Sequence, residues 1–221
     1  MKPTGLPTPS LSHFCKADFL QIYPPSEDTF LMLDTLELEA DWISSQVHPT
    51  IAAEIGTGSG CILAFLGQLF PNVLLIGSDV NRRACEATCK TLLHNSIGLG
   101  SAVQMEFLDG FSIGAGGEGK IDLLVFNPPY VPSEDCDFYE NPLDLACLGG
   151  DSRGRKVIDK FIARLDAVLS SKGVGYLLLM HQNDPLDVAL QLEKRGFHPE
   201  IVNKRRAGIE LLYLMKIVRK L

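Results

Sequence analysis

The run Asn127-Pro128-Pro129-Tyr130 offers the clearest chemistry in this chain of 221 residues. It follows Ile121–Phe126, an apolar run that indicates a buried strand, so Asn127 is expected at the carboxyl end of that strand. The two prolines fix φ and remove two backbone donors, which leaves nearby carbonyls free to accept hydrogen bonds. Such a site suits a substrate nitrogen that donates two hydrogen bonds and keeps its lone pair free, as methylation of an amide or an exocyclic amine requires.

Three of these residues are predicted to be catalytic. The Asn127 side-chain carbonyl and the Pro128 backbone carbonyl would each accept one N–H, and the Tyr130 ring would lie against a planar amide. Pro129 completes the predicted substrate-binding set. A turn-forming Asn before Pro and simple core packing of Tyr130 are the structural alternatives. For Asn127, the preceding strand and the acidic strand ends described next favour the functional interpretation.

A second group of residues is typical of a cofactor site. The glycine-rich residues 56–60 follow a short apolar strand, and glycine lets the backbone approach a ligand closely. A tight strand–helix turn would use the same glycines, so Gly56 and Gly58 alone indicate little. Asp79 closes the second predicted strand, 23 residues beyond Gly56, where its carboxylate can accept from both ribose hydroxyls. That spacing also fits a nicotinamide dinucleotide fold.

The charge of Glu54 decides which cofactor the site favours. A carboxylate just before the glycines attracts a sulfonium or ammonium group and repels a pyrophosphate, so S-adenosylmethionine fits better than a nicotinamide dinucleotide. Asp109 is placed to accept from an adenine amino group, with the Gly110 amide beside it as a donor. The cofactor-binding residues predicted in this way are Glu54, Gly56, Gly58, Asp79, Asp109, Gly110 and Asn127.

Strand-like and helix-like segments alternate along the chain, which predicts an α/β fold with a doubly wound, seven-stranded, mainly parallel sheet. A closing antiparallel hairpin is expected at the end, with its turn around residues 204–208. The stretch 131–152 is irregular and is interpreted as a functional lid. The predicted strands are 51–55, 73–77, 102–107, 121–126, 174–180, 197–202 and 209–218, and the predicted helices are 30–38 (capped by 26–29), 59–70, 81–94, 155–169 and 185–195.

Composition narrows the class of protein. Hydrophobic residues make up 46% and charged residues 21%, which is typical of a globular chain, here predicted to be a single domain over residues 1–221 with about 1–10 flexible. The net charge of −7 disfavours a broad phosphate-binding face and therefore a nucleic-acid substrate. The six cysteines form no CxxC pair and have no metal-ligand spacing with His, so no metal site is predicted. Without a signal peptide or membrane segment, we expect a reduced compartment, cytoplasm or nucleus.

Several segments resemble a known enzyme family. Residues 53–60, 78–81 and 126–130 read AEIGTGSG, SDVN and FNPPY, and together they resemble class I S-adenosylmethionine-dependent methyltransferases that methylate amino or amide nitrogens. Residues 23–34 and 203–216 read YPPSEDTFLMLD and NKRRAGIELLYLMK, and resemble the eukaryotic and archaeal branch of the HemK family, the release-factor glutamine methyltransferases. The resemblance covers about Tyr23 to Lys216. Bacterial members carry an additional amino-terminal helical domain, and we expect none in this protein.

The resemblance implies a Rossmann-like class I fold and further roles. Thr29 would reach the amino-acid end of the cofactor, and Arg205 would shape the rim of the site or dock the partner. The substrate would be the glutamine of the Gly-Gly-Gln loop in a class 1 peptide chain release factor, methylated at N5. Family members carry an aromatic residue near Cys147, ahead of the Gly149-Gly150 pair, and this chain lacks it.

The resemblance also implies a heterodimer with a small zinc-binding activator of the Trm family. The activator would pair with an edge strand, here residues 102–107, and cover apolar surface, which agrees with the mean hydropathy of +0.12. Histone lysine methylation and adenine N6-methylation of nucleic acid are the alternative activities, since the same motif serves amines. A non-catalytic binding subunit is a third hypothesis, which the intact acceptor motif and cofactor carboxylates disfavour.

Overall fold

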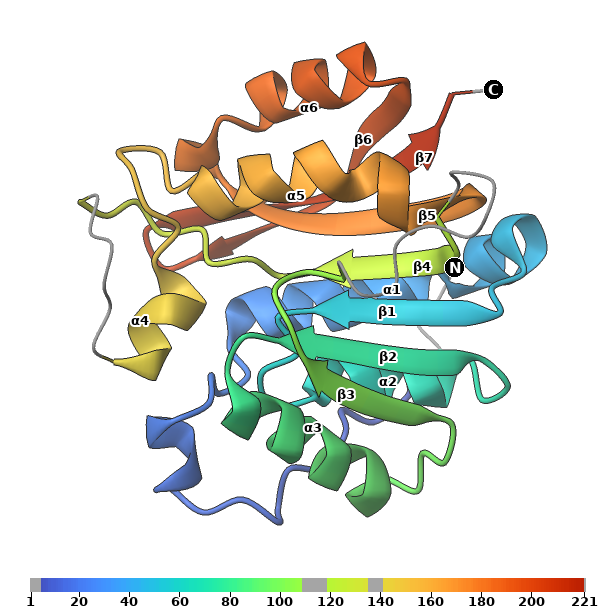
Figure 1. Cartoon of the computed structure of the whole chain (residues 1–221), viewed down its shortest axis with the longest axis vertical. Coiled ribbons are helices and arrows are strands. Elements are labelled where there is room, and N and C mark those ends of the chain that lie inside the picture. The colour runs from blue at the N-terminus through green and yellow to red at the C-terminus, as the bar shows by residue number, and fades with distance from the viewer. Residues whose placement is uncertain (1–4, 109–118, 135–140, 221) are drawn as a thin grey trace.

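A computed structural model describes residues 5–108, 119–134 and 141–220 and places seven strands in one sheet (Figure 1). The strand order is β3-β2-β1-β4-β5-β7-β6, with β7 antiparallel to both neighbours and the other pairs parallel. This confirms the predicted α/β class, the mainly parallel sheet and the closing hairpin. The strands are β1 (Ile51–Ile55), β2 (Leu74–Asp79), β3 (Gly100–Gln104), β4 (Ile121–Phe126), β5 (Leu169–Met180), β6 (Phe197–Ala207) and β7 (Glu210–Arg219).

Helices cover both faces of the sheet. Right-handed crossovers lead from β1 to β2 and from β4 to β5 in opposite directions, so the helices they contain, α2 and α5, lie on opposite faces. Figure 1 shows α1 and α2 behind the strands and α5 in front of them. None of the helices in the described ranges has both the length and the apolar character needed to span a membrane. The α-helices are α1 (Glu27–Trp42), α2 (Cys61–Leu69), α3 (Arg82–His94), α4 (Pro142–Cys147), α5 (Lys156–Val168) and α6 (Pro185–Lys194).

The bounds of β1 and β4 follow the apolar runs, whereas β5 begins at Leu169, five residues before the predicted strand 174–180, and the edge strand β3 is displaced. β1 and β4 begin and end as predicted, but the prediction of a third strand over 102–107 is wrong in its bounds, because β3 covers Gly100–Gln104. Phe107 has a left-handed φ of 52°, which ends any extended segment, and its buried ring packs edge-on against Phe126 at 6.2 Å. β3 is nevertheless an edge strand, as expected.

The closing hairpin is longer and tighter than predicted. Its strands pair as far as Ala207 and Glu210, so Gly208 and Ile209 alone form the turn, and residues 204–207 belong to β6. The glycine permits this turn because it adopts a φ of 59°. The stretch 131–152 was predicted to be irregular, but it contains the short helix α4, which Asn141 caps by accepting from the Leu143 N–H. Residues 135–140 lie outside the described part of the chain.

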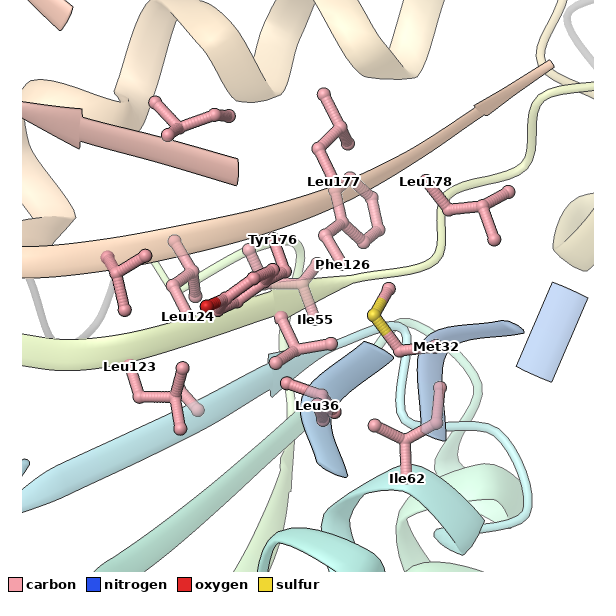
Figure 2. Close-up of a cluster of buried hydrophobic side chains, with 14 of the residues drawn as sticks. Met32, Leu36, Ile55, Ile62, Leu123, Leu124, Phe126, Tyr176, Leu177 and Leu178 are labelled. Carbon is pink, nitrogen blue, oxygen red and sulfur yellow. The ribbon is translucent and has the colours of Figure 1, made fainter. Parts of the chain in front are cut away.

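The core fixes the position of β4 and therefore of the residue that follows it. All six residues of β4 are buried, as expected for a parallel strand covered on both faces. Figure 2 shows part of this core, to which α1, α2, β1, β4 and β5 all contribute side chains. Each fully buried Leu, Ile or Phe contributes roughly 1.5–3 kcal/mol. The carboxyl end of β4 is thus a rigid point from which Asn127 projects.

The amino-terminal segment, residues 5–26, runs along α3 before it enters α1. Ser10 lies within the stretch predicted to be flexible. Its backbone N–H donates to Asn95 Oδ1 at 2.7 Å, and Asn95 Nδ2 donates back to the Ser10 carbonyl at 2.9 Å. The His13 ring lies 4.6 Å from that of His94, centroid to centroid. Burial, followed by the neighbouring positive charges of His94 and Lys90, lowers the pKa of His13, so the fold favours the neutral form of this imidazole.

Acidification should therefore loosen the amino-terminal segment. The pKa of His13 is lower in the fold than its ordinary 6.5, so the unfolded segment takes up its proton first, and stability is lost as pH falls through and below that value. Hydrogen exchange of backbone amides 10–22, corrected for intrinsic rates, should accelerate between about pH 7.5 and pH 5.5. His13→Gln cannot take up a proton and should remove this dependence. Equal protection at both pH values would contradict the prediction.

Candidate active site

The site lies at the switch point of the sheet, where neighbouring crossovers leave in opposite directions. β1 and β4 are adjacent, and Ile55 pairs with Phe126, so the residues that follow them, Gly56 and Asn127, leave the sheet side by side. Gly56 has a φ of 67°, and a Cβ there would lie 3.5 Å from the Phe126 ring and 3.8 Å from the Asn127 carbonyl. The turn after β1 thus lies beside the start of the Asn-Pro-Pro-Tyr segment, with space for about one methyl group between them.

A cavity of about 620 Å³ opens at this edge. Its wall comes from the ends of β1, β2 and β4, the start of α1, the helix α4 and the start of β7. All predicted site residues that the structure describes lie in this wall, whereas Asp109 and Gly110 lie outside the described residues. The predicted residues brought together are Thr29, Glu54, Gly56, Gly58, Asp79, Asn127, Pro128, Pro129 and Tyr130.

The half of the cavity next to β1 and β2 is acidic. Asp79 accepts from the backbone N–H groups of Gly58 at 3.0 Å and Asn81 at 2.8 Å, which fixes its carboxylate at the end of β2. Glu54 is almost fully buried and accepts from the Thr57 hydroxyl at 3.1 Å. Burial raises the pKa of Asp79 and raises that of Glu54 well above its ordinary value. Both carboxylates therefore carry a desolvation cost that a bound cation would relieve.

The charged side chains among the described lining residues are all acidic. Among the described lining residues there are six carboxylates and no Lys, Arg or His. A site of this kind attracts a sulfonium or ammonium group, and it offers no cationic side chain to hold a phosphate. The lining carboxylates are Glu27, Asp28, Glu54, Asp79, Glu106 and Glu210.

Asn127, in the wall of the other half of the cavity, holds a buried acceptor that is unpaired among the described residues. Its Nδ2 donates to Asp28 Oδ2 at 3.1 Å, while its Oδ1 is buried and is without a hydrogen-bond partner among the described residues. A buried carbonyl oxygen left unpaired in this way is costly unless a ligand supplies a donor. The Tyr130 hydroxyl donates to the same Asp28 oxygen at 3.3 Å, and its ring is 8% exposed.

The backbone after Asn127 is supported from beneath by residues distant in sequence. Asn183 Nδ2 donates to the Tyr130 carbonyl at 2.8 Å. A Cβ on Gly154 would lie 2.1 Å from that carbonyl oxygen, and one on Gly149 would lie 2.8 Å from the Pro129 oxygen. These close approaches, together with the two prolines, leave residues 127–130 little freedom to move.

Sequence reasoning missed several residues of the cavity wall, above all Asp28. The segment reading SEDT was interpreted as a helix cap, and Ser26 with Thr29 does form a capping box. The carboxylate of Asp28, however, points to Asn127 rather than acting only on the helix. Arg205 does not line the cavity but pairs with Asp34 and, at 3.7 Å, with Glu27, and so ties β6 to the first turns of α1. Tyr23, Glu106, Cys147 and Glu210 also line the cavity without having been predicted.

Comparison with known proteins gives the family. No protein-family model matches the chain. The eRF1 methyltransferase catalytic subunit mtq2 of Schizosaccharomyces pombe is 35% identical over 97% of this chain and 96% of its own length. The chain belongs to the HemK family of methyltransferases. Methyltransferase HEMK2 of Homo sapiens is 32% identical over 96% of both chains. The structure of the E. cuniculi Mtq2–Trm112 complex contains a chain 30% identical to this HemK-family enzyme, with a TM-score of 0.64 over 90% of this chain and 99% of that one.

Replacing Glu54 by Gln should stabilise this HemK-family enzyme when no cofactor is bound. The raised pKa means that the ionised Glu54 carboxylate is disfavoured in the fold. The stability that the protonated side chain contributes is therefore present in full below pH 4.5 and is lost as pH rises through the folded pKa. Glu54→Gln should therefore raise Tm near pH 8, by roughly 2–4 °C for each 1 kcal/mol relieved, and change it little near pH 5.

The matched control is Glu193→Gln on the exposed face of α6. This variant should leave Tm unchanged at both pH values. If Glu54→Gln lowered Tm near pH 8, or raised it equally at both pH values, burial of the Glu54 charge would not be the cause.

Proposed function

We propose that this enzyme transfers a methyl group from S-adenosylmethionine to N5 of a glutamine side chain in the Gly-Gly-Gln loop of a class 1 peptide chain release factor. The single observation that carries the proposal is the buried, unpaired Oδ1 of Asn127 at the switch point of a HemK-family fold. We further propose that residues 1–221 act as one methyltransferase domain. A cytoplasmic or nuclear location remains a prediction.

The acidic half of the cavity fits the cofactor. S-adenosylmethionine supplies an electrophilic methyl group on a positively charged sulfonium. Glu54 and the other lining carboxylates favour its net positive charge, and Asp79, held by Gly58 and Asn81, is placed to accept from ribose hydroxyls. Thr29 lies buried in the same wall, at the start of α1, where the amino-acid end of the cofactor is proposed to bind. Asp109 and Gly110 remain the proposed contacts for adenine.

The Asn127 half of the cavity fits a primary amide. Asn127 Oδ1 and the Pro128 carbonyl would accept the two N–H bonds of the substrate nitrogen, which holds it in place and raises its electron density. Loss of one such preorganised partner typically costs ~3–4 kcal/mol, by analogy with oxyanion-hole donors. The nitrogen proton becomes acidic only after methyl transfer, so no strong base is needed. Tyr130, in the same wall, would lie against the flat amide and select planar substrates.

The site supports the alternative substrates less well. Adenine in nucleic acid would bring phosphates to a cavity with six carboxylates and no cationic side chain among its described lining residues. A non-catalytic subunit would have no need for an unpaired Asn127 acceptor, whose burial is costly. The relative from S. pombe is named an eRF1 methyltransferase, which supports a release factor as the substrate.

We propose that β3 binds a small zinc-binding Trm-type activator. β3 is an edge strand, and apolar side chains lie exposed on and beside it, with Leu99 at 51% and Val103 at 39% exposure. An edge strand with exposed apolar residues is typical of a surface that binds another protein. The relative from E. cuniculi is seen in complex with Trm112, which supports this choice of partner.

The first test is methyl transfer from labelled S-adenosylmethionine to the release factor, in the presence of the activator. Wild-type enzyme should label the Gly-Gly-Gln glutamine and should not label its Gln→Ala variant. Asn127→Ala should lower kcat by about 100- to 1,000-fold, because one fixed acceptor for the transferring nitrogen is lost. Asn72→Ala, in an exposed turn, is the matched control and should keep full activity. Label on histone lysine or DNA instead of the release factor would refute the proposed substrate.

The partner is tested separately. Leu99→Asp and Val103→Asp place charges on the β3 edge and should abolish co-purification with the activator, while the isolated wild-type chain should be poorly soluble or inactive. Leu190→Asp on α6, where the leucine is 54% exposed, is the control and should leave the complex intact. Full activity of the wild-type chain as a pure monomer would overturn this part of the proposal.

A further inference from the structure

Asp28 is a buried carboxylate to which the proposed reaction has so far assigned no role. It lies in the first turn of α1 and is 3% exposed. Its Oδ1 accepts from the backbone N–H and the hydroxyl of Thr29, at 2.6 and 3.2 Å. Its Oδ2 accepts from the Tyr23 hydroxyl at 3.1 Å, Asn127 Nδ2 at 3.1 Å and the Tyr130 hydroxyl at 3.3 Å. A single carboxylate thus connects three separate segments of the chain beside the cavity.

The contact with Asp28 determines which end of the Asn127 amide faces the cavity. An ionised carboxylate can only accept hydrogen bonds, so the NH₂ end must turn toward Asp28 and the carbonyl end must turn away. A reversed amide would place two acceptor oxygens about 3 Å apart without a proton between them, and would point donors at the substrate N–H groups. The observed Asn127 Oδ1 is unpaired and buried in the cavity wall, as this orientation requires.

Asp28 also affects the strength of the acceptor and the position of the neighbouring ring. A hydrogen bond from Nδ2 to a charged acceptor polarises the Asn127 amide and makes its oxygen a stronger acceptor. Burial first, and then the charge of Asp28, raises the pKa of Tyr23 and of Tyr130, so both hydroxyls remain donors to the carboxylate. The Tyr130 ring is thereby held beside the same part of the cavity.

We propose that Asp28 is a positioning residue for methyl transfer, which orients the Asn127 amide with its carbonyl toward the substrate nitrogen and fixes Tyr130 beside it. The inference rests on the proposed function, because it assumes a substrate N–H that Asn127 must accept. In this role Asp28 acts through Asn127 and Tyr130 and does not need to contact the substrate.

The test exchanges the two side chains. Asp28→Asn is nearly isosteric, but its amide can donate to Asn127 and stabilise the reversed orientation, so kcat should fall by about 100-fold while the cofactor Kd and Tm stay close to wild type. Asn127→Asp alone sets two carboxylates against each other and should be equally impaired. The double variant Asp28→Asn/Asn127→Asp restores a donor–acceptor pair and leaves an oxygen facing the substrate, so it should recover at least about tenfold over either single variant. Asp41→Asn, exposed near the end of α1, is the control for charge on the helix and should behave as wild type.

A second measurement needs neither substrate nor activity. In the wild-type protein, the Nδ2 protons of Asn127, assigned by their loss in Asn127→Ala, should exchange with water much more slowly than those of exposed Asn72. Their resonances should shift in Asp28→Asn and not in Asp41→Asn.

The outcomes separate the two hypotheses. Lack of release-factor methylation by the wild-type enzyme would refute the proposed function, while the Asn127 resonances would still test the orientation. Unchanged kcat in Asp28→Asn, impairment without recovery in the double variant, or fast exchange of the Asn127 side-chain protons in the wild-type protein would each overturn the role of Asp28.

Discussion

The adjacency of β1 and β4 is the constraint on which the site depends. Because the two strands are parallel neighbours and their crossovers diverge, the residues that follow Ile55 and Phe126 emerge into one crevice that neither helix layer fills. The buried core holds both strands in register, so the glycine turn lies beside residues 127–130. The sheet itself therefore places the proposed cofactor half of the cavity next to the proposed substrate half.

The second feature on which the site depends is electrostatic, and it lowers the stability of the fold. Glu54 and Asp79 are buried carboxylates whose pKa is raised by desolvation, and the described part of the cavity wall holds no positive side chain to offset them. A chain selected only for stability would replace such groups with neutral ones. Their presence agrees with the proposed cofactor, whose positive charge would offset that of Glu54 and whose ribose hydroxyls would donate to Asp79. The unpaired Asn127 oxygen also lowers the stability of the fold, because a buried acceptor without a donor is costly, and an N–H group of the proposed substrate would supply that donor.

The sequence predicted what depends on local pattern and missed what depends on distant contacts. β1, β4 and the start of α3 at Asn81 follow from apolar runs and a capping residue. Nine of the predicted site residues line the cavity; eight of them were predicted because they lie at or just after strand ends, whereas Thr29, at the start of α1, was implied by the family resemblance. The predicted third strand was placed too far along the chain because Phe107, although apolar, packs against Phe126 of β4 and does not pair in the edge strand. Arg155, the first residue of the helix predicted over 155–169, is buried against Asp159 and Asp187, which lies in the following helix α6. Asp28 meets a partner 99 residues away, which no local pattern reveals.

The acidic cavity bears on the choice between an amide and an amine as the methyl acceptor. A lysine entering a cavity with six lining carboxylates would be held in its protonated form, because neighbouring negative charge raises the pKa of an ammonium group, and a protonated amine has no lone pair to attack. A glutamine amide is neutral throughout the physiological pH range, so the neighbouring negative charges do not protonate its nitrogen. Two fixed acceptors, one of them oriented through Asp28, then suit the two N–H bonds of that amide. The charges that favour the cofactor thus also favour a neutral nucleophile, so one arrangement of carboxylates serves both halves of the reaction.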